Sequence, residues 1–309
     1  MSPKDICIIM NAGSGQQDAG LGPEKIEAAF VDLGAACTVK LIDDGATIEA
    51  ETRNALNEGY KKIVAAGGDG TICAVASAIR GSAAAMGILP LGTFNYVARS
   101  LDVPTDVAAA AKVIVQAKSR TMRIATLNDS VFLNNASLGA YPAILETREG
   151  IYKRWGRSRP AAYWAVIKTL GTVRPPLRLR ITADGKTRDV RSPLVFVVNN
   201  AYQLRQMGVE GADLIEDGKM VVFIAPDATR IEMIRMAAVI AMGMGLPERK
   251  FEVMSGAEIL IEGIGRRSRR SRAIARDGER EHLSLPFRLK VIEDALTVLV
   301  ADPDPGTPR

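Results

Sequence analysis

The sequence predicts two domains: an α/β domain with a largely parallel sheet, followed by a β-rich domain built as an antiparallel sandwich. First, apolar segments typical of strands alternate with segments of helical periodicity through residues 5–117. Second, strand-like segments follow one another mostly without helices after about Arg123, with Asp-Ser and Asp-Gly turn signals between several of them. Third, three strand ends of the first half carry glycine with Ser, Thr or Asn, and such ends converge on one edge of a doubly wound sheet.

The composition is that of a chain that can bury a large core. The 309 residues are 47% hydrophobic and 24% charged, which suffices for one large or two ordinary domains. The three cysteines lack metal-ligand spacing, and the single histidine, His282, excludes a multi-histidine metal site. No signal peptide is visible, and the best apolar stretch, 233–246, is too short to span a bilayer. We therefore expect a cytoplasmic protein with reduced thiols.

The elements of the first domain follow its hydrophobic pattern. Gly22-Pro23 opens the first helix, in which Ile26, Phe30 and Leu33 recur at helical spacing. We expect strands at 5–10, 37–42, 63–66 and 86–89, and helices at 24–33, 47–58, 72–80, 95–101 and 106–117.

The second domain is predicted as a series of strands bounded by turn residues. We place the first domain at 1–123 and the second at 124–288, and we expect the tail 302–309 to be disordered. The second domain is expected to contain strands at 126–127, 131–136, 177–181, 194–198, 220–224, 258–261 and 289–300, with helical stretches at 160–173 and 228–245.

The chain is organised around residues 63–71, which read IVAAGGDGT. An apolar strand runs into Gly67, Gly68 and Gly70, and a helical pattern follows directly. Glycines let the backbone approach a phosphate closely, and the helix N-terminus adds N–H groups and a positive dipole end. Asp69 inside this turn indicates a cation or proton chemistry nearby. The alternative is a tight strand-to-helix turn without a ligand.

Two further glycine turns follow predicted strands. Residues 11–15 (NAGSG) offer backbone N–H groups and a hydroxyl suited to phosphate, and residues 91–95 (LGTFN) follow the fourth strand. The first turn lacks the lysine of a GxxxxGK[ST] loop, and no turn has GxGxxG spacing, which weakens a hydride-transfer function. Three polar glycine turns at one sheet edge are a stronger signal than any one of them.

Two acidic turns of the second half could take part in chemistry. Asp277-Gly278-Glu279 places two carboxylates amid arginines, which suits deprotonation of a hydroxyl in phosphoryl transfer. A β-turn with salt-bridged flanks is the alternative. Residues 213–219 (DLIEDGK) could bind a cation through a carboxylate and turn carbonyls, and the alternative there is an ordinary Asp-Gly hairpin turn.

Two basic runs, at 148–159 and 266–280, hold much of the positive charge of a chain whose net charge is +5. Such runs suit anionic partners: a lipid surface, a nucleic acid or a phosphorylated substrate. The alternative is that these runs are solvated faces or loops. This alternative is weaker for the second run, where crowding of like charges has an energetic cost.

Several motifs together resemble one family. They are NAGSG (11–15), AAGGDGT (65–71), LPLGTFN (89–95), NNASLG (134–139), NNAYQ (199–203), LIEDGK (214–219) and RDGE (276–279). Through them nearly the whole chain resembles the soluble bacterial lipid kinases of the diacylglycerol kinase catalytic-domain family, which also includes sphingosine and ceramide kinases. GGDGT alone is shared with NAD kinases and phosphofructokinases, whereas its combination with LGTxN and a late DGE is much more specific.

The resemblance implies that ATP binds between the two domains. It implies Glu279 as the proton acceptor for a lipid hydroxyl, with Asp277 beside it and Asp69 as a rival base. The implied nucleotide-binding residues are Asn11, Gly13, Ser14, Gly15, Gly67, Gly68, Asp69, Gly70, Thr71 and Thr93.

The resemblance also implies a structural Mg²⁺ in the second domain. Its implied ligands are the carbonyls of Leu214 and Lys219 and the carboxylate of Asp217. The last strand of the family returns to the first domain, so residues 289–301 are expected to pack there.

Three positions depart from the family pattern. Ala12 stands in place of a proline, Tyr96 in place of the acid of LGTxND, and Asp43 in place of the threonine that usually follows the second strand. The arginines at 266–272 are unusually dense. We hypothesise that they dock the protein on anionic lipid headgroups, each charge contributing about 1 kcal/mol.

We interpret the chain as an ATP- and Mg²⁺-dependent lipid kinase that acts peripherally at an anionic membrane surface on a diacylglycerol-like acceptor, without a nucleic-acid partner. One alternative is an NAD kinase-like phosphotransferase, although LPLGTFN stands where an NxGxLGFL-type string is expected. Another is a non-catalytic lipid- or nucleotide-binding protein on the kinase scaffold, which Tyr96 leaves open and the intact GGDGT and DGE motifs argue against. The acceptor lipid and the oligomeric state, a homodimer included, stay open.

Overall fold

The structure is a computed structural model that describes residues 5–13, 22–139, 176–227, 232, 251–265 and 271–301. The predicted helix at 160–173, nearly all of that at 228–245 and the tail from 302 lie outside the described residues. No helix in the described ranges is long and apolar enough to cross a membrane.

The chain divides into two compact units. The first comprises residues 1–125, 200–210 and 292–309, and the second comprises residues 126–199 and 211–291. The division differs from the predicted domains at residues 200–210, which belong to the first unit because helix α8 (Ala201–Met207) packs against helix α4 (Tyr96–Ser100). Strands β5 (Ser119–Leu127) and β16 (Phe287–Leu299) have residues in both units.

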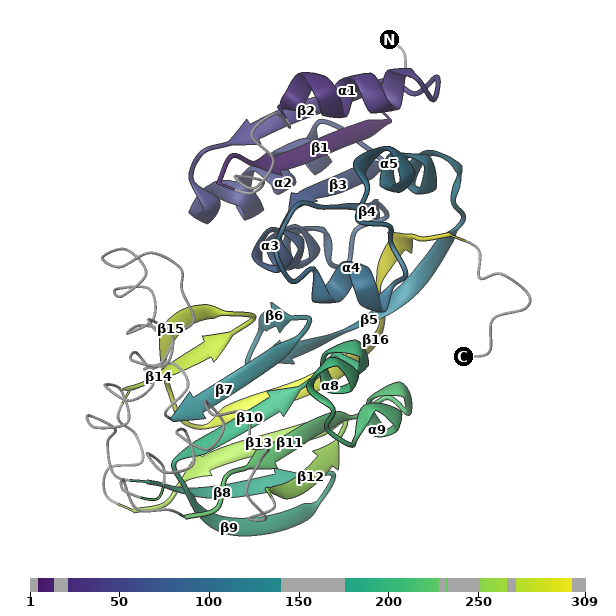
Figure 1. The fold of residues 1–309 in the computed structure, drawn as a ribbon. Helices are drawn as coiled ribbons and strands as arrows, with labels where there is room; N and C mark the ends of the chain where they lie inside the picture. The colour runs from purple at the N-terminus through teal and green to yellow at the C-terminus, as the bar shows by residue number, and fades with distance from the viewer. Residues whose placement is uncertain are drawn as a thin grey trace. The chain divides into compact units, whose positions relative to one another are not determined.

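The first unit is a parallel sheet flanked by helices (Figure 1). Its strands lie in the order β2-β1-β3-β4-β16, and every pair between neighbours is parallel. The strands are β1 (Ile6–Asn11), β2 (Cys37–Ile42), β3 (Lys62–Gly67), β4 (Ala85–Pro90) and the end of β16. The other helices are α1 (Pro23–Val31), the 3₁₀ helix η1 (Gly45–Thr47), α2 (Ile48–Asn57), α3 (Asp69–Ile79) and α5 (Val107–Gln116).

The core of the first unit comes from strands that are buried on both faces. Ile8, Ile9, Ile63 and Val64 are fully buried, because helices cover both sides of a parallel sheet. Helix α1 starts at Pro23 after an uncapped Gly22, as the sequence predicts. The α/β fold class is therefore confirmed.

The second unit is built from antiparallel strands. One sheet has the order β12-β11-β10-β7-β14-β15 (Figure 1). The strands β16-β13-β8-β9 are the antiparallel part of the ten-stranded sheet to which β2-β1-β3-β4 also belong. The predicted antiparallel sandwich is confirmed. Its elements are β6 (Ser130–Phe132), β7 (Asn135–Gly139), β8 (Leu177–Ala183), β9 (Lys186–Ser192), β10 (Leu194–Val198), α9 (Ala212–Glu216), β11 (Met220–Ile224), β12 (Glu252–Gly256), β13 (Glu258–Gly263), β14 (Ser271–Arg276) and β15 (Glu279–Ser284).

Candidate active site

The strand order places a ligand crevice between β1 and β3. The chain leaves β1 for β2 on one side and returns to β3 on the other, so the strand order reverses between β1 and β3. In open α/β sheets, ligands bind outside the carboxyl ends of the strands at this reversal. The β1 turn and the β3 turn both lie there. The amide of Asn11 joins them: its Nδ2 donates to Thr71 Oγ1 at 3.3 Å, and its Oδ1 accepts from Gly13 N at 3.0 Å.

The glycines of the β3 and β4 turns let two backbones meet. A Cβ on Gly92 would lie 2.5 Å from Gly68 Cα, and a Cβ on Gly67 would lie 2.4 Å from Thr71 Oγ1. The N–H of Leu91 donates to Gly67 O at 3.0 Å. The turn that contains Thr93 is thereby held near the N-terminus of α3. Gly68 is the N-cap residue of α3 and makes no side-chain cap hydrogen bond. The N–H groups of the first turn of α3 and the helix dipole suit an anion such as phosphate.

Asn95 is a structural residue of this edge that sequence reasoning missed. Asn95 is 4% exposed, and its backbone lies in the left-handed region at φ 51°. Its Oδ1 accepts from Gly92 N at 3.0 Å, while its Nδ2 donates to Gly92 O at 2.8 Å. Asn tolerates this conformation better than other residues with side chains, so the last residue of the LGTFN turn is itself the signal. Asn95 therefore fixes the shape of the turn that carries Thr93.

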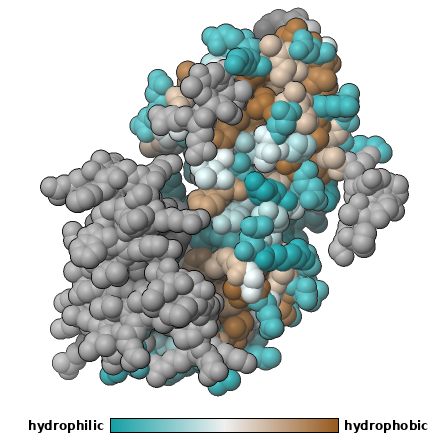
Figure 2. Space-filling view, viewed as in Figure 1, coloured by the Kyte–Doolittle hydropathy of each residue, from teal (hydrophilic) through white to brown (hydrophobic). Residues whose placement is uncertain are grey.

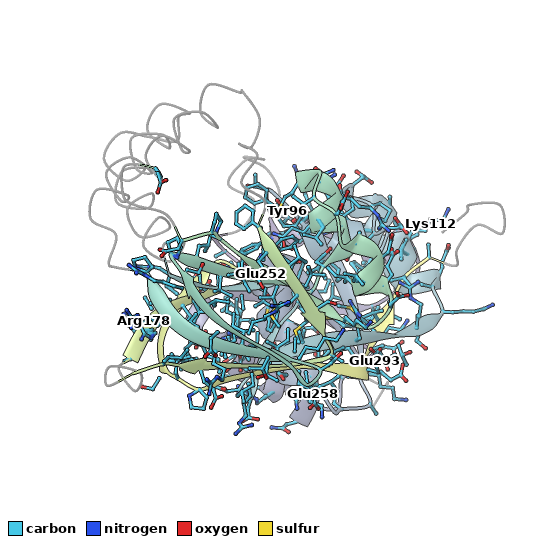
Figure 3. All side chains as sticks on the ribbon, turned by 90° about the horizontal axis from the view of Figure 1, so that it is seen from below. Tyr96, Lys112, Arg178, Glu252, Glu258 and Glu293 are labelled. Carbon is cyan, nitrogen blue, oxygen red and sulfur yellow. The ribbon has the colours of Figure 1, made fainter. Side chains whose placement is uncertain are left out.

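Asp69 and Tyr96 have defined contacts within the first unit. Asp69 Oδ1 accepts from Val97 N at 3.0 Å, so the aspartate of the glycine turn also holds the start of α4. Tyr96, labelled in Figure 3, stacks its ring on Phe94 with the centroids 5.5 Å apart and the planes at 4°. Tyr96, which stands where the LGTxND pattern has an acid, is thus one member of a stacked aromatic pair.

The structure brings most of the predicted nucleotide-binding residues to one edge of the first unit. Their backbone N–H groups, hydroxyls and close glycine packing fit a phosphate chain. Ser14 and Gly15 lie outside the described residues. The residues at this edge are Asn11, Gly13, Gly67, Gly68, Asp69, Gly70, Thr71 and Thr93.

In the second unit, Asp277 and Gly278 form the turn between β14 and β15. Both have positive φ, 47° and 88°, which is typical of a two-residue type I′ hairpin. The Asp277 carboxylate accepts three backbone N–H groups: Leu133 N at 2.7 Å, Asn134 N at 2.8 Å and Asn135 N at 2.9 Å. These donors lie where β6 gives way to β7, so the predicted strand 131–136 is interrupted there. Asp277 is therefore a positioning residue.

Glu279 differs from Asp277 in its surroundings. It is exposed, and within the described part of the chain its side chain makes no hydrogen bond or ion pair. The flank of the turn is nevertheless salt-bridged, as the alternative reading expected, because Arg276 Nε donates to Glu281 at 2.8 Å. Of the two carboxylates, the one on Asp277 is engaged by the backbone and the one on Glu279 is exposed to solvent.

We expect Asp277→Ala to destabilise the protein by about 2–4 kcal/mol. It removes the acceptor of three partly buried N–H groups, and alanine is strained at positive φ. Asp277→Asn keeps one acceptor oxygen and tolerates positive φ, so it should cost less. Urea unfolding followed by circular dichroism measures both variants. An unchanged urea midpoint for Asp277→Ala would contradict the positioning role.

The DLIEDGK segment is a helix end and not a hairpin turn, so that alternative is wrong. Helix α9 ends at Glu216 with Asp217 as its C-cap, Gly218 has φ 83°, and Lys219 N donates to Leu214 O at 3.1 Å. Asp217 is exposed, and its side chain makes no hydrogen bond or ion pair within the described ranges.

The Asp217 carboxylate and the Leu214 carbonyl could supply some of the oxygen ligands of a hard cation. The described residues contain no group of three or more His, Cys, Asp or Glu that could hold a metal. A single carboxylate, on Asp217, and the second lone pair of the Leu214 carbonyl suit Mg²⁺, which commonly keeps several water ligands. Leu214, Asp217 and Lys219 would hold such an ion.

We expect Mg²⁺ at about ten times its Kd to raise the Tm of the wild type by about 2–4 °C, because a ligand of the folded state stabilises it. Asp217→Asn should lose most of this shift. Asp213→Asn removes the same charge from the exposed start of α9 and is the matched control. Thermal scans with and without Mg²⁺ measure the shift, and an equal shift in all three proteins would refute the assignment.

Comparisons with known proteins follow the two-unit division. A model of the diacylglycerol kinase catalytic domain matches residues 5–127, and a model of the YegS C-terminal NAD kinase β-sandwich-like domain matches residues 152–300. Diacylglycerol kinases of Staphylococcus aureus strains JH9 and Newman are 32% identical over 176 residues, which is 56% of this chain and 54% of theirs. The chain thus spans about half the length of the curated relatives it matches.

Solved structures share the fold over nearly the whole chain. A crystal structure described as a diacylglycerol kinase from Bacillus anthracis superimposes with a TM-score of 0.67 and 19% identity. The match covers 98% of this chain and 99% of that one. At this identity the likeness shows the fold alone.

Proposed function

Because this chain belongs to the family that joins a diacylglycerol kinase catalytic domain to a YegS-type C-terminal domain, we propose that it is an ATP- and Mg²⁺-dependent lipid kinase. The proposed reaction transfers the γ-phosphoryl group of ATP to the hydroxyl of a diacylglycerol-like acceptor and releases ADP. The observation that carries the proposal is the set of phosphate-suited glycine turns that follow β1, β3 and β4 in the first unit.

The first unit supplies the phosphate site of this proposal. Bound ATP would provide the phosphoryl group, with Mg²⁺ screening the phosphate charges. The N-terminus of α3 offers fixed N–H donors, which need no reorganisation during transfer. Asn11 and Thr71 hold the turns on either side of the crevice together. These residues would orient the triphosphate.

The second unit supplies the base. Phosphoryl transfer to a hydroxyl needs a carboxylate that orients or deprotonates that hydroxyl. Asp277 is engaged by three backbone N–H groups, and Asp69 accepts from Val97 N. Glu279, two residues after Asp277 at the start of β15, would take the proton of the acceptor as its oxygen attacks the γ-phosphorus.

We place the acceptor at an anionic membrane surface. Figure 2 shows apolar residues at the surface of the first unit. Phe94, next to Thr93, is 56% exposed. An exposed aromatic ring beside a phosphate site suits contact with lipid tails and headgroups. The arginines at 266–270, which we hypothesise to bind headgroups, lie outside the described residues.

The test is transfer of labelled phosphate from ATP to a panel of lipids in detergent micelles, with NAD in a parallel reaction. A labelled lipid establishes the activity and names the acceptor. Labelled NAD phosphate without labelled lipid would favour the NAD kinase-like alternative. Binding of ATP by folded protein without any transfer would favour a non-catalytic role on the kinase scaffold.

A further inference from the structure

We propose that Asp43 binds the ribose hydroxyls of the nucleotide and selects ribonucleotides over deoxyribonucleotides. The inference rests on the proposed ATP site. It begins from strand β2, which is the edge strand beside β1. Ile42 pairs with Asn11 in the parallel register, and Ala12 N donates to Ile42 O at 2.9 Å. Asp43 therefore follows β2 directly beside the first glycine turn.

The carboxylates at this edge differ in how they are used. Among described residues that directly follow β1 to β4, the acids are Asp43, Asp44 and Asp69. Asp44 Oδ1 accepts from Ala46 N at 2.9 Å and caps η1, and Asp69 Oδ1 accepts from Val97 N at 3.0 Å. Asp43 is exposed and makes no hydrogen bond or ion pair in the described part of the chain.

The charges and hydrogen-bond donors of a nucleotide determine which of its groups the Asp43 carboxylate can bind. A carboxylate repels the triphosphate, whereas ribose hydroxyls are donors that need acceptors. The α3 N-terminus, which suits the phosphates, lies at the end of β3, two strand spacings or about 10 Å from β2. Phosphates at β3 and a ribose at β2 would therefore lie along the same edge of the sheet, with β1 between them. An acid after a strand that binds a ribose is also the arrangement of other doubly wound sheets.

The experiment is isothermal titration calorimetry of the full chain with ATP, 2′-deoxyATP and 3′-deoxyATP. A hydrogen bond to a charged group predicts that the wild type binds ATP about 10- to 100-fold more tightly than at least one deoxy analogue. Asp43→Ala should bind ATP and that analogue equally. Asp44→Asn removes the same charge one residue away and keeps the capping oxygen, so it should retain the discrimination.

The outcomes separate this inference from the proposed function. Equal binding of ATP and both analogues by the wild type would overturn the inference and leave the lipid kinase proposal standing. Discrimination that persists in Asp43→Ala would overturn it as well. No binding of any nucleotide by folded wild type would overturn both, because the ATP site itself would be absent.

Discussion

Replacing Glu279 by glutamine is expected to lower kcat for lipid phosphorylation by about 10²- to 10⁴-fold, the range typical of losing a general base. Glutamine keeps the size of the side chain but cannot accept a proton from the attacking hydroxyl. Glu279 is exposed and makes no hydrogen bond within the described residues, so the variant should fold with wild-type stability. Steady-state kinetics with the lipid identified by the transfer assay measure kcat, and calorimetry measures ATP affinity, which should not change.

The matched control for this variant is Glu281→Gln. Glu281 lies two residues along β15, on the same face of the strand, and its carboxylate accepts from Arg276 Nε at 2.8 Å. Its replacement removes the same charge and a half-buried ion pair that contributes about 1 kcal/mol or less, so kcat should stay within a few-fold. If both variants lose activity equally, the effect is one of local charge. If Glu279→Gln is fully active, the base is Asp69 or another group.

The first unit was predictable because its elements are patterned by burial. Strands buried on both faces read as apolar runs, and glycine turns mark their ends, so the parallel sheet followed from local sequence. In the second unit, strand β9 was missed. Its side chains are mostly exposed because it is an edge strand that needs only backbone pairing. Arg180 Nε on β8 and Asp189 Oδ1 on β9 form an ion pair at 2.7 Å. The same contact holds the pKa of Asp189 below its ordinary value. No apolar alternation identifies such a strand.

The candidate site divides in the same way. The turns that contain Gly67, Gly92 and Asp277 could be identified from sequence because turn chemistry is local. The contacts that the side chains of these turns make could not be predicted from the sequence. Asp277 binds N–H groups 142 to 144 residues away along the chain, and Asn95 shapes its own turn, so only the fold separates a positioning carboxylate from an available one. The motif predicted where the acids lie, and the contacts distinguish the engaged carboxylate of Asp277 from that of Glu279, which we propose as the base.

Gly92→Ala is expected to weaken ATP binding about 100-fold or more. The added Cβ would lie 2.5 Å from Gly68 Cα, where ordinary contacts begin at 3.4 Å, so the β3 and β4 turns must move apart by about 1 Å. The contact with Gly68 is with backbone, so no side-chain rotation can relieve it, and the Cβ would also lie 2.8 Å from Asn95 Oδ1. A displacement of this size at a binding site commonly costs 10²-fold, and overpacking should also lower the free energy of unfolding by about 1–3 kcal/mol.

Gly45→Ala is the control for this prediction. Gly45 follows β2 at the same edge, but its Cβ would lie 4.0 Å from Asn11 Nδ2, an ordinary contact. It should therefore bind ATP as the wild type does. Calorimetry of both variants with ATP, with thermal scans to confirm folding, distinguishes the close approach of the two turns from a general sensitivity to losing glycine. Wild-type ATP affinity in Gly92→Ala would mean that the β4 turn lies outside the nucleotide site, and Thr93 would then lose its proposed role.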